Sequence, residues 1–406
     1  MLLDGQRLRT SDEENTTDAT FELFVTHNRT FHCDEVMAYA MAKILYPNLA
    51  VVRTRSKEAI SLYIDNKNAL IVDVGGVHCP PLQFDHHQKG FDEEYHMGAD
   101  DKPLDRCNPK YPRIPVLMSS CGLFWKHYGE DIINKVLNDK TDESFAVKVP
   151  EDFTIDDSNM KAIKDKIYNR FILPIDANDN GINQYDEDAV KNFSSDINIP
   201  TAVSKFNRDP NCPPLQMDQF IEAFKFCSSV LLNFLKSTLI EEIEYITYKP
   251  IFEEISNKRR YLNVKTDEGV FDNQILVSDR VFPGTVYNRL LREYDSKYNI
   301  LFTIMRRNDV EYNVWTRSKN KFDTIAKVIP KDTAERLGIK DIKFVHNNGF
   351  IAVTTNRLMA LRLAQQSLSH YNGQKRNKLY WRAVLFGMVI LLISVLVKKA
   401  QLTSIE

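Results

Sequence analysis

The stretch ALIVDVGGVHCPPLQFDHH, residues 69–87, contains two short apolar runs, each followed at once by side chains that can bind metal ions or move protons. The first run, ALIV, is too apolar for a half-exposed strand, which is typical of a strand buried in a parallel sheet. Asp73 follows this run, and Asp85, His86 and His87 follow the second one. The stretch therefore predicts a buried parallel sheet whose carboxyl edge carries aspartates and histidines.

The sequence upstream supplies the rest of a strand, helix and strand unit. FELFVTH, residues 21–27, is an apolar run of strand type that ends at His27. VMAYAMAKIL, residues 36–45, has apolar side chains at helical spacing, and Pro47 ends that run. LAVVRTR, residues 49–55, is a further strand-like run. This order predicts an α/β fold built from βαβ connections.

Composition narrows the class of protein. The 406 residues are 43% hydrophobic, which is enough for two globular domains. A net charge of -2 provides no global basic field that would point to a nucleic-acid partner. The six cysteines are widely spaced, and the polar, acidic residues 1–20 differ from a signal peptide, so the sequence indicates a reducing, cytosolic compartment.

Changes of pattern along the chain predict its organisation. A helix is expected to run up to Pro174, where a polar turn, DANDNG, follows. A second, long helix is expected over residues 217–247. The predicted segments are a disordered tail (1–20), a parallel-sheet domain (21–206), a linker with the long helix (207–248), a smaller α+β domain (249–372), and a basic flank with an apolar tail (373–406).

Several strands of the predicted sheet end in polar side chains. In parallel sheets, ligands gather at the carboxyl ends of the strands, so we expect these side chains to converge. They are His27, His32, Asp34, Asp73, Asp85, His86 and His87, joined by Asp176 or Asp179 of DANDNG. Imidazoles and carboxylates without a set of thiolates suit Mn²⁺, Mg²⁺, Fe or Zn²⁺. Two such ions that share a carboxylate perform phosphoryl displacement well, and Asp73 is the candidate bridge.

The order of motifs resembles a known family. THNRTFHCDE, VRTR, VDVGG, FDHHQKGF, SSCGL, IDANDNGI and HNNGFI follow one another as in the melanocyte proliferating gene 1 exonuclease branch of the DHH phosphoesterase superfamily. The resemblance covers residues 21–371. It implies a metal-dependent exoribonuclease that degrades RNA from the 3′ end, with an N-terminal DHH-type catalytic domain and a C-terminal substrate-binding domain. It also implies two divalent metal ions, Mn²⁺ before Mg²⁺ or Zn²⁺.

The resemblance also implies roles for the residues at the sheet edge. The first metal would be bound by His27, His32 and Asp73, and the second by Asp34, Asp73, His86 and Asp179, with Asp176 as the alternative to Asp179. Relatives usually carry an Asp-x-Asp pair where this chain has His32-Cys33-Asp34. The first metal would then have two neutral ligands and one carboxylate. His87 would be a catalytic residue that contacts the scissile phosphate or protonates the leaving oxygen. Asp85 would orient the ring of His87 or of a liganding histidine.

Candidate substrate-binding residues lie in both domains. Arg53 and Arg55 occupy alternate positions of a predicted strand, from which they would reach a phosphate or cap the sheet edge. Lys89 lies in the turn after FDHH. The resemblance assigns the HNNGF turn to substrate binding, with His346, Asn347 and Gly349 as its candidates.

The C-terminal tail carries no charge between residues 383 and 397, and basic residues flank that stretch. This pattern predicts a transmembrane tail anchor that leaves both domains in the cytosol. A short span with basic flanks favours the mitochondrial outer membrane over the endoplasmic reticulum. Without an anchor, the nucleus or cytoplasm is expected. Two alternative functions stay open: a phosphoesterase for small molecules or short oligonucleotides, and a membrane-tethered RNA-binding scaffold with a degenerate site.

Overall fold

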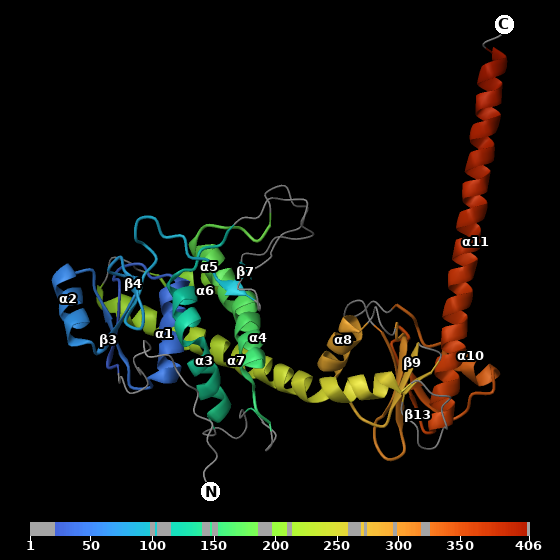
Figure 1. Ribbon diagram of the computed structural model, residues 1–406, viewed down its shortest axis with the longest axis horizontal. Helices are drawn as coiled ribbons and strands as arrows, with labels where there is room; N and C mark the ends of the chain where they lie inside the picture. Colours follow the sequence, from blue (N-terminus) through green and yellow to red (C-terminus); the bar gives the residue numbers. More distant parts are fainter. Residues whose placement is uncertain are drawn as a thin grey trace. The chain divides into compact units, whose positions relative to one another are not determined.

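The computed structural model describes residues 21–97, 102–103, 115–139, 147, 153–185, 197–208, 213–258, 269–271, 274–294, 299–317 and 325–403 (Figure 1). The predicted tail, residues 1–20, lies outside them. The chain divides into two compact units, Met1–Glu242 and Ile243–Glu406.

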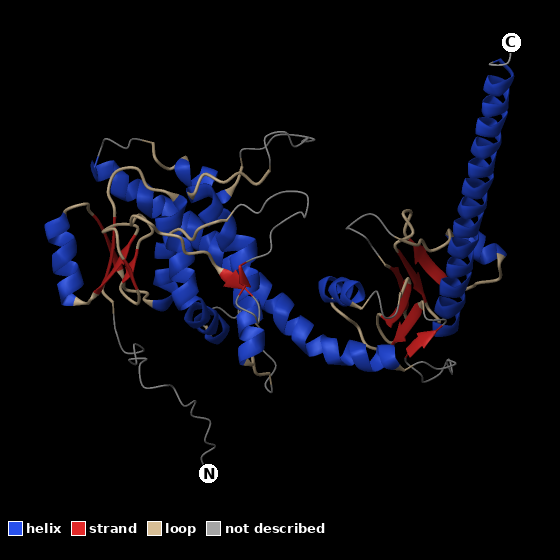
Figure 2. Cartoon of the chain, turned by 45° about the horizontal axis from the view of Figure 1, so that its top comes forward, coloured by secondary structure: helices blue, strands red, loops and turns tan. Residues whose placement is uncertain are grey.

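The first unit contains the predicted parallel sheet. Its strand order is β2-β1-β3-β5-β4, in which β4 alone is antiparallel to its neighbour. Figure 2 draws the strands of this sheet in red, with helices beside them. The elements are β1 (Leu23–Thr26), α1 (Cys33–Leu45), β2 (Ala50–Arg53), α2 (Lys57–Asn66), β3 (Ala69–Val72), β4 (His78–Cys79) and β5 (Gln83–Phe84). All four side chains of β3 are buried, as expected of a central parallel strand. The predicted α/β fold is confirmed for this unit.

Helices complete the first unit. They are α3 (Ser120–Asn138), α4 (Asp157–Ile167), a π-helical turn (Tyr168–Ile172), α5 (Leu173–Asp179) and α6 (Ile199–Ser204). Two short strands, β6 (His96–Met97) and β7 (Lys102–Pro103), pair with each other. The expectation of a turn after Pro174 was wrong, because α5 continues to Asp179. Proline is tolerated there since it occupies the first turn of α5, where its missing N–H removes little helical hydrogen bonding.

The long helix α7 (Pro213–Asn257) begins earlier and ends later than predicted, and it contributes residues to both units. It continues through Pro250, which ordinarily costs a helix interior about 3 kcal/mol. Beyond residue 243 the helix buries Tyr245, Phe252 and Ile255 in a cluster with Phe282 and Tyr287. Each such side chain contributes roughly 1.5–3 kcal/mol on burial, which offsets the cost of the proline.

The second unit is the predicted α+β domain. Its sheet has the order β12-β13-β11-β10-β9-β8, antiparallel except for the pair β9 and β10. The elements are β8 (Gly269–Phe271), β9 (Ile275–Ser278), α8 (Gly284–Glu293), β10 (Phe302–Arg306), β11 (Tyr312–Thr316), α10 (Lys331–Arg336), β12 (Ile342–Val345), β13 (Ile351–Thr354) and α11 (Arg357–Thr403). The sequence predicted a single clear helix here, and α8 and α10 were missed.

Helix α11 joins the folded domain to the predicted tail without interruption. Its first turns lie beside the sheet (Figure 1). Ala360, Leu363 and Ala364 of these turns belong to the buried core of this unit. Further on, Leu379, Tyr380, Trp381 and Leu385 are 57–65% exposed. Side chains of residues 386–406 lie outside the described part. Within that part, one helix, residues 216–257, is long and apolar enough to cross a membrane, and 33% of its apolar window is buried in the protein.

Candidate metal centre

The carboxyl edge of the first sheet gathers side chains from several elements. His27 follows β1, and His32 directly precedes α1, whose first turn carries Asp34. Asp73 follows β3, and His86 follows β5 after one intervening residue. Asp179 is the last residue of α5. The predicted convergence of strand ends therefore places these side chains in one region.

Asp73 lies at the middle of the group and is buried. One carboxylate oxygen, Oδ2, is 3.2 Å from His27 Nε2. The other, Oδ1, is 3.5 Å from His86 Nε2 and 3.4 Å from His87 Nδ1, and it accepts a hydrogen bond from Ser120 Oγ at 3.2 Å. A carboxylate that faces imidazoles through both oxygens has the disposition of a bridge between two ions.

The backbone of Asp73 is unusual, because its φ of 57° lies in the left-handed region. Gly75 and Gly76, with φ of 102° and 70°, follow it. A non-glycine residue in this conformation is uncommon, and such strain clusters at functional sites. The tight VDVGG turn thus carries the residue whose carboxylate faces His27 and His86.

A second group of potential ligands adjoins the first. Donor atoms of His32, Asp34 and Asp179 lie within 4.8 Å of one another. His86 Nε2 is 3.2 Å from Asp179 Oδ2 and so links the two groups. Asp34 is 1% exposed, and neither of its oxygens has a hydrogen-bond donor among the described residues. A buried carboxylate without a donor is costly, so this position fits a bound divalent cation.

Glu35 belongs to the site although the sequence analysis did not single it out. Its side chain is fully buried, and Oε1 lies 3.1 Å from His27 Nε2. Both oxygens accept the backbone N–H of His32, at 2.9 and 3.0 Å. A glutamate three residues after a helix N-cap was the available signal. Glu35 adds a carboxylate beside His27 and His32, where the family resemblance implied mostly neutral ligands.

The buried carboxylates of the group favour positive charge beside them, as the pKa values of its residues indicate. Burial disfavours protonation of His27, but hydrogen bonds to Asp73 and Glu35 outweigh burial and raise its pKa from 6.5 to about 10. Burial and the nearby charge of Asp73 raise the pKa of Asp34 well above its usual value. A protonated His27 thus balances the neighbouring carboxylates Asp73 and Glu35, and a metal ion would displace that proton.

His87 and Asp85 form a hydrogen-bonded pair at the edge of the group, where His87 also lies with Asp73 and His86 as a potential ligand. The His87 side chain is 63% exposed, whereas Asp85 is buried. Asp85 Oδ1 lies 2.8 Å from His87 Nδ1, and Oδ2 accepts the Gly76 N–H at 2.6 Å. The hydrogen bond to Asp85 raises the pKa of His87 despite partial burial. A histidine held through Nδ1 presents Nε2 as its second hydrogen-bonding atom, which suits proton transfer to a substrate.

Asp176, the alternative metal ligand, has a different environment. Its buried carboxylate accepts hydrogen bonds from Ser119 N, Ser119 Oγ, Gly122 N and Tyr168 Oη, at 2.7–3.1 Å. A Cβ on Gly122 would lie 2.3 Å from Asp176 Oδ2, so glycine is required there. Burial raises the pKa of Asp176 to about 7 against these hydrogen bonds. The Asp176 carboxylate therefore already accepts hydrogen bonds from the described residues around it. Asp179, in contrast, lies within the group of potential metal ligands.

The predicted substrate-binding residues divide into three cases. Arg53 donates from Nε to His27 O at 3.1 Å and from a terminal nitrogen to Arg29 O at 2.6 Å, so it holds the loop that carries the ligands. Arg55 and Lys89 are exposed. Because β2 ends at Arg53, the expectation that both arginines lie on one strand was wrong.

The third case is the HNNGF turn of the second unit. His346, Asn347 and Gly349 lie between β12 and β13. Gly349 has a φ of 68°, and a Cβ there would lie 2.9 Å from Val328 O. Glycine is therefore required by both its conformation and its neighbours.

A parallel sheet with adjoining groups of imidazoles and carboxylates at its carboxyl edge has the arrangement of a metal-dependent hydrolase. The MYG1 exonuclease family model, described as an uncharacterised protein family (UPF0160), matches residues 23–368, and the chain belongs to this family. Family and site together make the protein a metal-dependent phosphodiesterase.

Relatives match most of the chain. The MYG1 protein of Schizosaccharomyces pombe is 26% identical over 364 residues, which is 84% of this chain and 96% of the relative. The MYG1 exonuclease of Mus musculus is 27% identical over 356 residues, 85% of this chain and 84% of the relative. Among solved structures, RecJ from Thermus thermophilus in complex with Mg²⁺ is 9% identical, with a TM-score of 0.23 over 87% of this chain and 50% of RecJ.

Proposed function

We propose that the protein is a two-metal exonuclease that shortens RNA from its 3′ end and is tethered to a membrane by its C-terminal helix. The observation that carries the proposal is the pairing of Asp73, which faces imidazoles through both oxygens, with Asp34, a buried carboxylate without a donor among the described residues. The name of the mouse relative, an exonuclease, supports the exonuclease activity. RNA as substrate and the 3′ to 5′ direction rest on the family resemblance of the motifs.

The ligand groups suggest how each residue contributes. One ion would be held by His27, His32, Asp73 and Glu35, and the other by Asp34, Asp73, His86 and Asp179. A pair of divalent ions lowers the pKa of a bound water and offsets phosphate charge. Mn²⁺ is the first candidate, with Mg²⁺ or Zn²⁺ as alternatives, because the donor set is oxygen and imidazole nitrogen.

Side chains of the protein carry out the proton transfer and its positioning. His87 delivers a proton to the leaving 3′ oxygen as the phosphodiester bond breaks. Asp85 fixes the His87 ring through Nδ1 and stabilises its protonated form. Ser120 donates to Asp73 and keeps that carboxylate in place. Arg55 and Lys89, both exposed, are available to the substrate backbone.

The direct test uses a 5′-labelled RNA and purified full-length protein with Mn²⁺. We expect a ladder of products shortened from the 3′ end. Asp73→Asn should abolish the ladder, and asparagine is chosen because it tolerates the left-handed φ of 57°. Asp309→Asn, at a position 95% exposed in its side chain, is the matched control and should leave the ladder unchanged. Failure to cleave any phosphoester with any divalent ion would contradict the proposal.

Substrate length separates this function from the alternatives. A series from dinucleotides to oligomers of about 20 nucleotides should show rates that rise with length for an exonuclease that uses a second domain to bind RNA. A preference for dinucleotides or small phosphoesters would favour the small-molecule phosphoesterase. A purified protein that binds RNA but contains no metal would favour the scaffold.

The membrane tether is supported by the tail. Helix α11 runs unbroken to Thr403, and the last described side chains before the uncharged stretch include exposed Leu379, Tyr380 and Trp381. Aromatic side chains of this kind suit a membrane interface. With the tail inserted, both domains face the cytosol, and the short span with basic flanks favours the mitochondrial outer membrane.

A further inference from the structure

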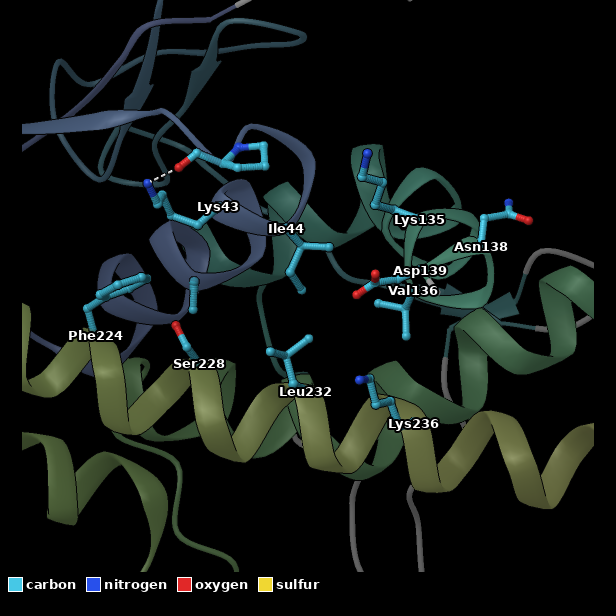
Figure 3. Close-up of a pocket in the computed structure, with 12 residues that line it drawn as sticks. Lys43, Ile44, Lys135, Val136, Asn138, Asp139, Phe224, Ser228, Leu232 and Lys236 are labelled. Carbon is cyan, nitrogen blue, oxygen red and sulfur yellow. Dashed lines mark hydrogen bonds between the residues drawn. The ribbon is translucent and has the colours of Figure 1, made fainter. Parts of the chain in front are cut away.

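A groove of about 620 Å³ lies between α1, α3 and α7 of the first unit (Figure 3). Ala40, Lys43 and Ile44 line it from the last turns of α1. The metal-centre residues Asp34 and Glu35 lie on the first turn of the same helix, so the groove is a separate site. Its volume falls within the range of about 300–1,000 Å³ that is typical of small-ligand sites.

Half of the residues that line the groove are apolar: Ala40, Ile44, Pro47, Val136, Phe224 and Leu232. On α7, the groove is lined by Phe224, Ser228, Leu232 and Lys236, whose four-residue spacing places them on one face of the helix. Leu232 and Ile44 point toward each other across the space (Figure 3). The Phe224 ring already packs against Tyr39, with ring centroids 4.7 Å apart. An aliphatic chain fits this surface better than a planar base, which would need a free aromatic face for stacking.

Ser228 carries a polar atom that its surroundings leave without a partner. Its Oγ is buried, and no described residue offers it a hydrogen bond. A buried hydroxyl in this state costs about 1–3 kcal/mol. The hydroxyl stands among the lining side chains (Figure 3). An oxygen atom of a ligand would supply the missing partner.

The charged groups of the groove favour an anion. Lys43, Lys135 and Lys236 line it, against a single carboxylate among the described lining residues, Asp139, which leaves an excess of two positive charges. The Lys43 side chain donates to the carbonyl oxygens of Pro47 and Leu49 at the groove. Ammonium groups act as compact charges and suit a small anionic head such as a carboxylate.

From these features we propose that the groove binds a single-chain aliphatic carboxylate, the chemical class of long-chain fatty acids. The chain lies along Ile44, Val136 and Leu232. The carboxylate is held by the lysines, and the Ser228 hydroxyl, which is buried in this structure, turns toward the groove and donates to one of its oxygens. This site is distinct from the phosphodiesterase centre.

The test is photolabelling of the full-length protein in phosphatidylcholine nanodiscs with a diazirine-bearing palmitic acid. Peptide mapping should place the label on residues 36–45 and 224–236. The methyl ester of the same probe has the same chain without the charge, and it should label these peptides about threefold less, because it cannot pair with the lysines. Equal labelling by the acid and the ester, or no label in these peptides, would overturn the proposal.

Variants localise the effect. Leu232→Trp fills the groove and should reduce labelling about tenfold, because the larger side chain takes the space and the apolar contacts of the ligand's chain. Ile240→Trp, at a 42% exposed position of the same helix, is its control. The double variant Lys135→Ala/Lys236→Ala should label equally with the acid and the ester, and both changes lie outside the core. Lys225→Ala, at an exposed position, should keep the preference for the acid. Asp73→Asn should leave labelling unchanged.

Competition identifies the ligand class. Unlabelled palmitate should displace the probe. Displacement by adenosine monophosphate and not by palmitate would assign the groove to nucleotides and overturn the proposal.

Discussion

Two aspartates on α5, three residues apart, have opposite surroundings. Asp176 accepts hydrogen bonds from Ser119, Gly122 and Tyr168, whereas Asp179 lies 3.2 Å from His86 Nε2. Asp176→Ala leaves several buried donors unpaired and should lower the free energy of unfolding by about 3 kcal/mol or more. Asp179→Ala should reduce bound metal to fewer ions per chain with a much smaller loss of stability. Chemical denaturation and elemental analysis of both variants test this contrast, and an unstable Asp179→Ala with full metal content would contradict it.

The pairing of Asp85 with His87 predicts a pH effect. The hydrogen bond to Asp85 raises the pKa of His87, so Asp85→Asn should lower that pKa. His87 must be protonated to act as an acid, so the rate falls as pH rises through its pKa. In Asp85→Asn, the alkaline fall of kcat/KM should therefore move to lower pH. An unshifted alkaline limb would show that another group is the acid, and Asp309→Asn provides the unaltered reference profile.

At the scale of elements, Arg53 acts as a clamp on the loop between β1 and α1. It donates to the carbonyls of His27 and Arg29, and its guanidinium lies over the rings of Phe31 and Phe220, at 5.3 and 4.9 Å. Arg53→Gln should weaken metal binding and lower the free energy of unfolding by about 2 kcal/mol, because hydrogen bonds to a charged group are lost.

Arg55 is the matched comparison. It is exposed beyond β2, so Arg55→Gln should raise KM for RNA and leave metal affinity unchanged. Metal titration and steady-state kinetics of the two variants separate the roles. If Arg53→Gln has a normal metal affinity and a raised KM for RNA, Arg53 binds substrate rather than holding the loop.

Elements with strong periodicity were predictable from the sequence. The buried strand β3 and the largely buried helix α1 follow from ALIV and VMAYAMAKIL, and their order located most of the site. The sequence did not predict that helices continue through Pro174 and Pro250. A π-helical turn precedes Pro174, and tertiary packing stabilises the helix around Pro250. The distinction between Asp176 and Asp179 also depends on distant partners such as Ser119, which local sequence does not reveal.

At the scale of the whole molecule, the tail is expected to decide where the protein acts. The packed turns of α11 extend to Leu368, with Tyr371 against the same core, so a chain that ends at Gly373 keeps these contacts. We expect the truncated protein to be soluble and still active. The full chain should remain with membranes in carbonate extraction, with both domains open to added protease.

A reporter provides the control for this prediction. Residues 373–406 fused to a soluble reporter should carry it to the same membrane. A full-length protein that is extracted by carbonate would contradict the anchor and leave the phosphodiesterase centre unaffected.

The left-handed backbone at Asp73 limits which amino acids this position can accept. Glycine and asparagine adopt that conformation readily, whereas β-branched residues incur a steric cost of roughly 1–2 kcal/mol or more. A saturation library sorted by cellular abundance should therefore keep glycine, asparagine and aspartate and lose valine, isoleucine and threonine. Sorting the same library by RNA hydrolysis should keep aspartate alone. Two requirements thus limit the amino acids at this position: the backbone conformation and the metal-binding carboxylate. Asparagine meets the first requirement and fails the second, so it distinguishes their effects.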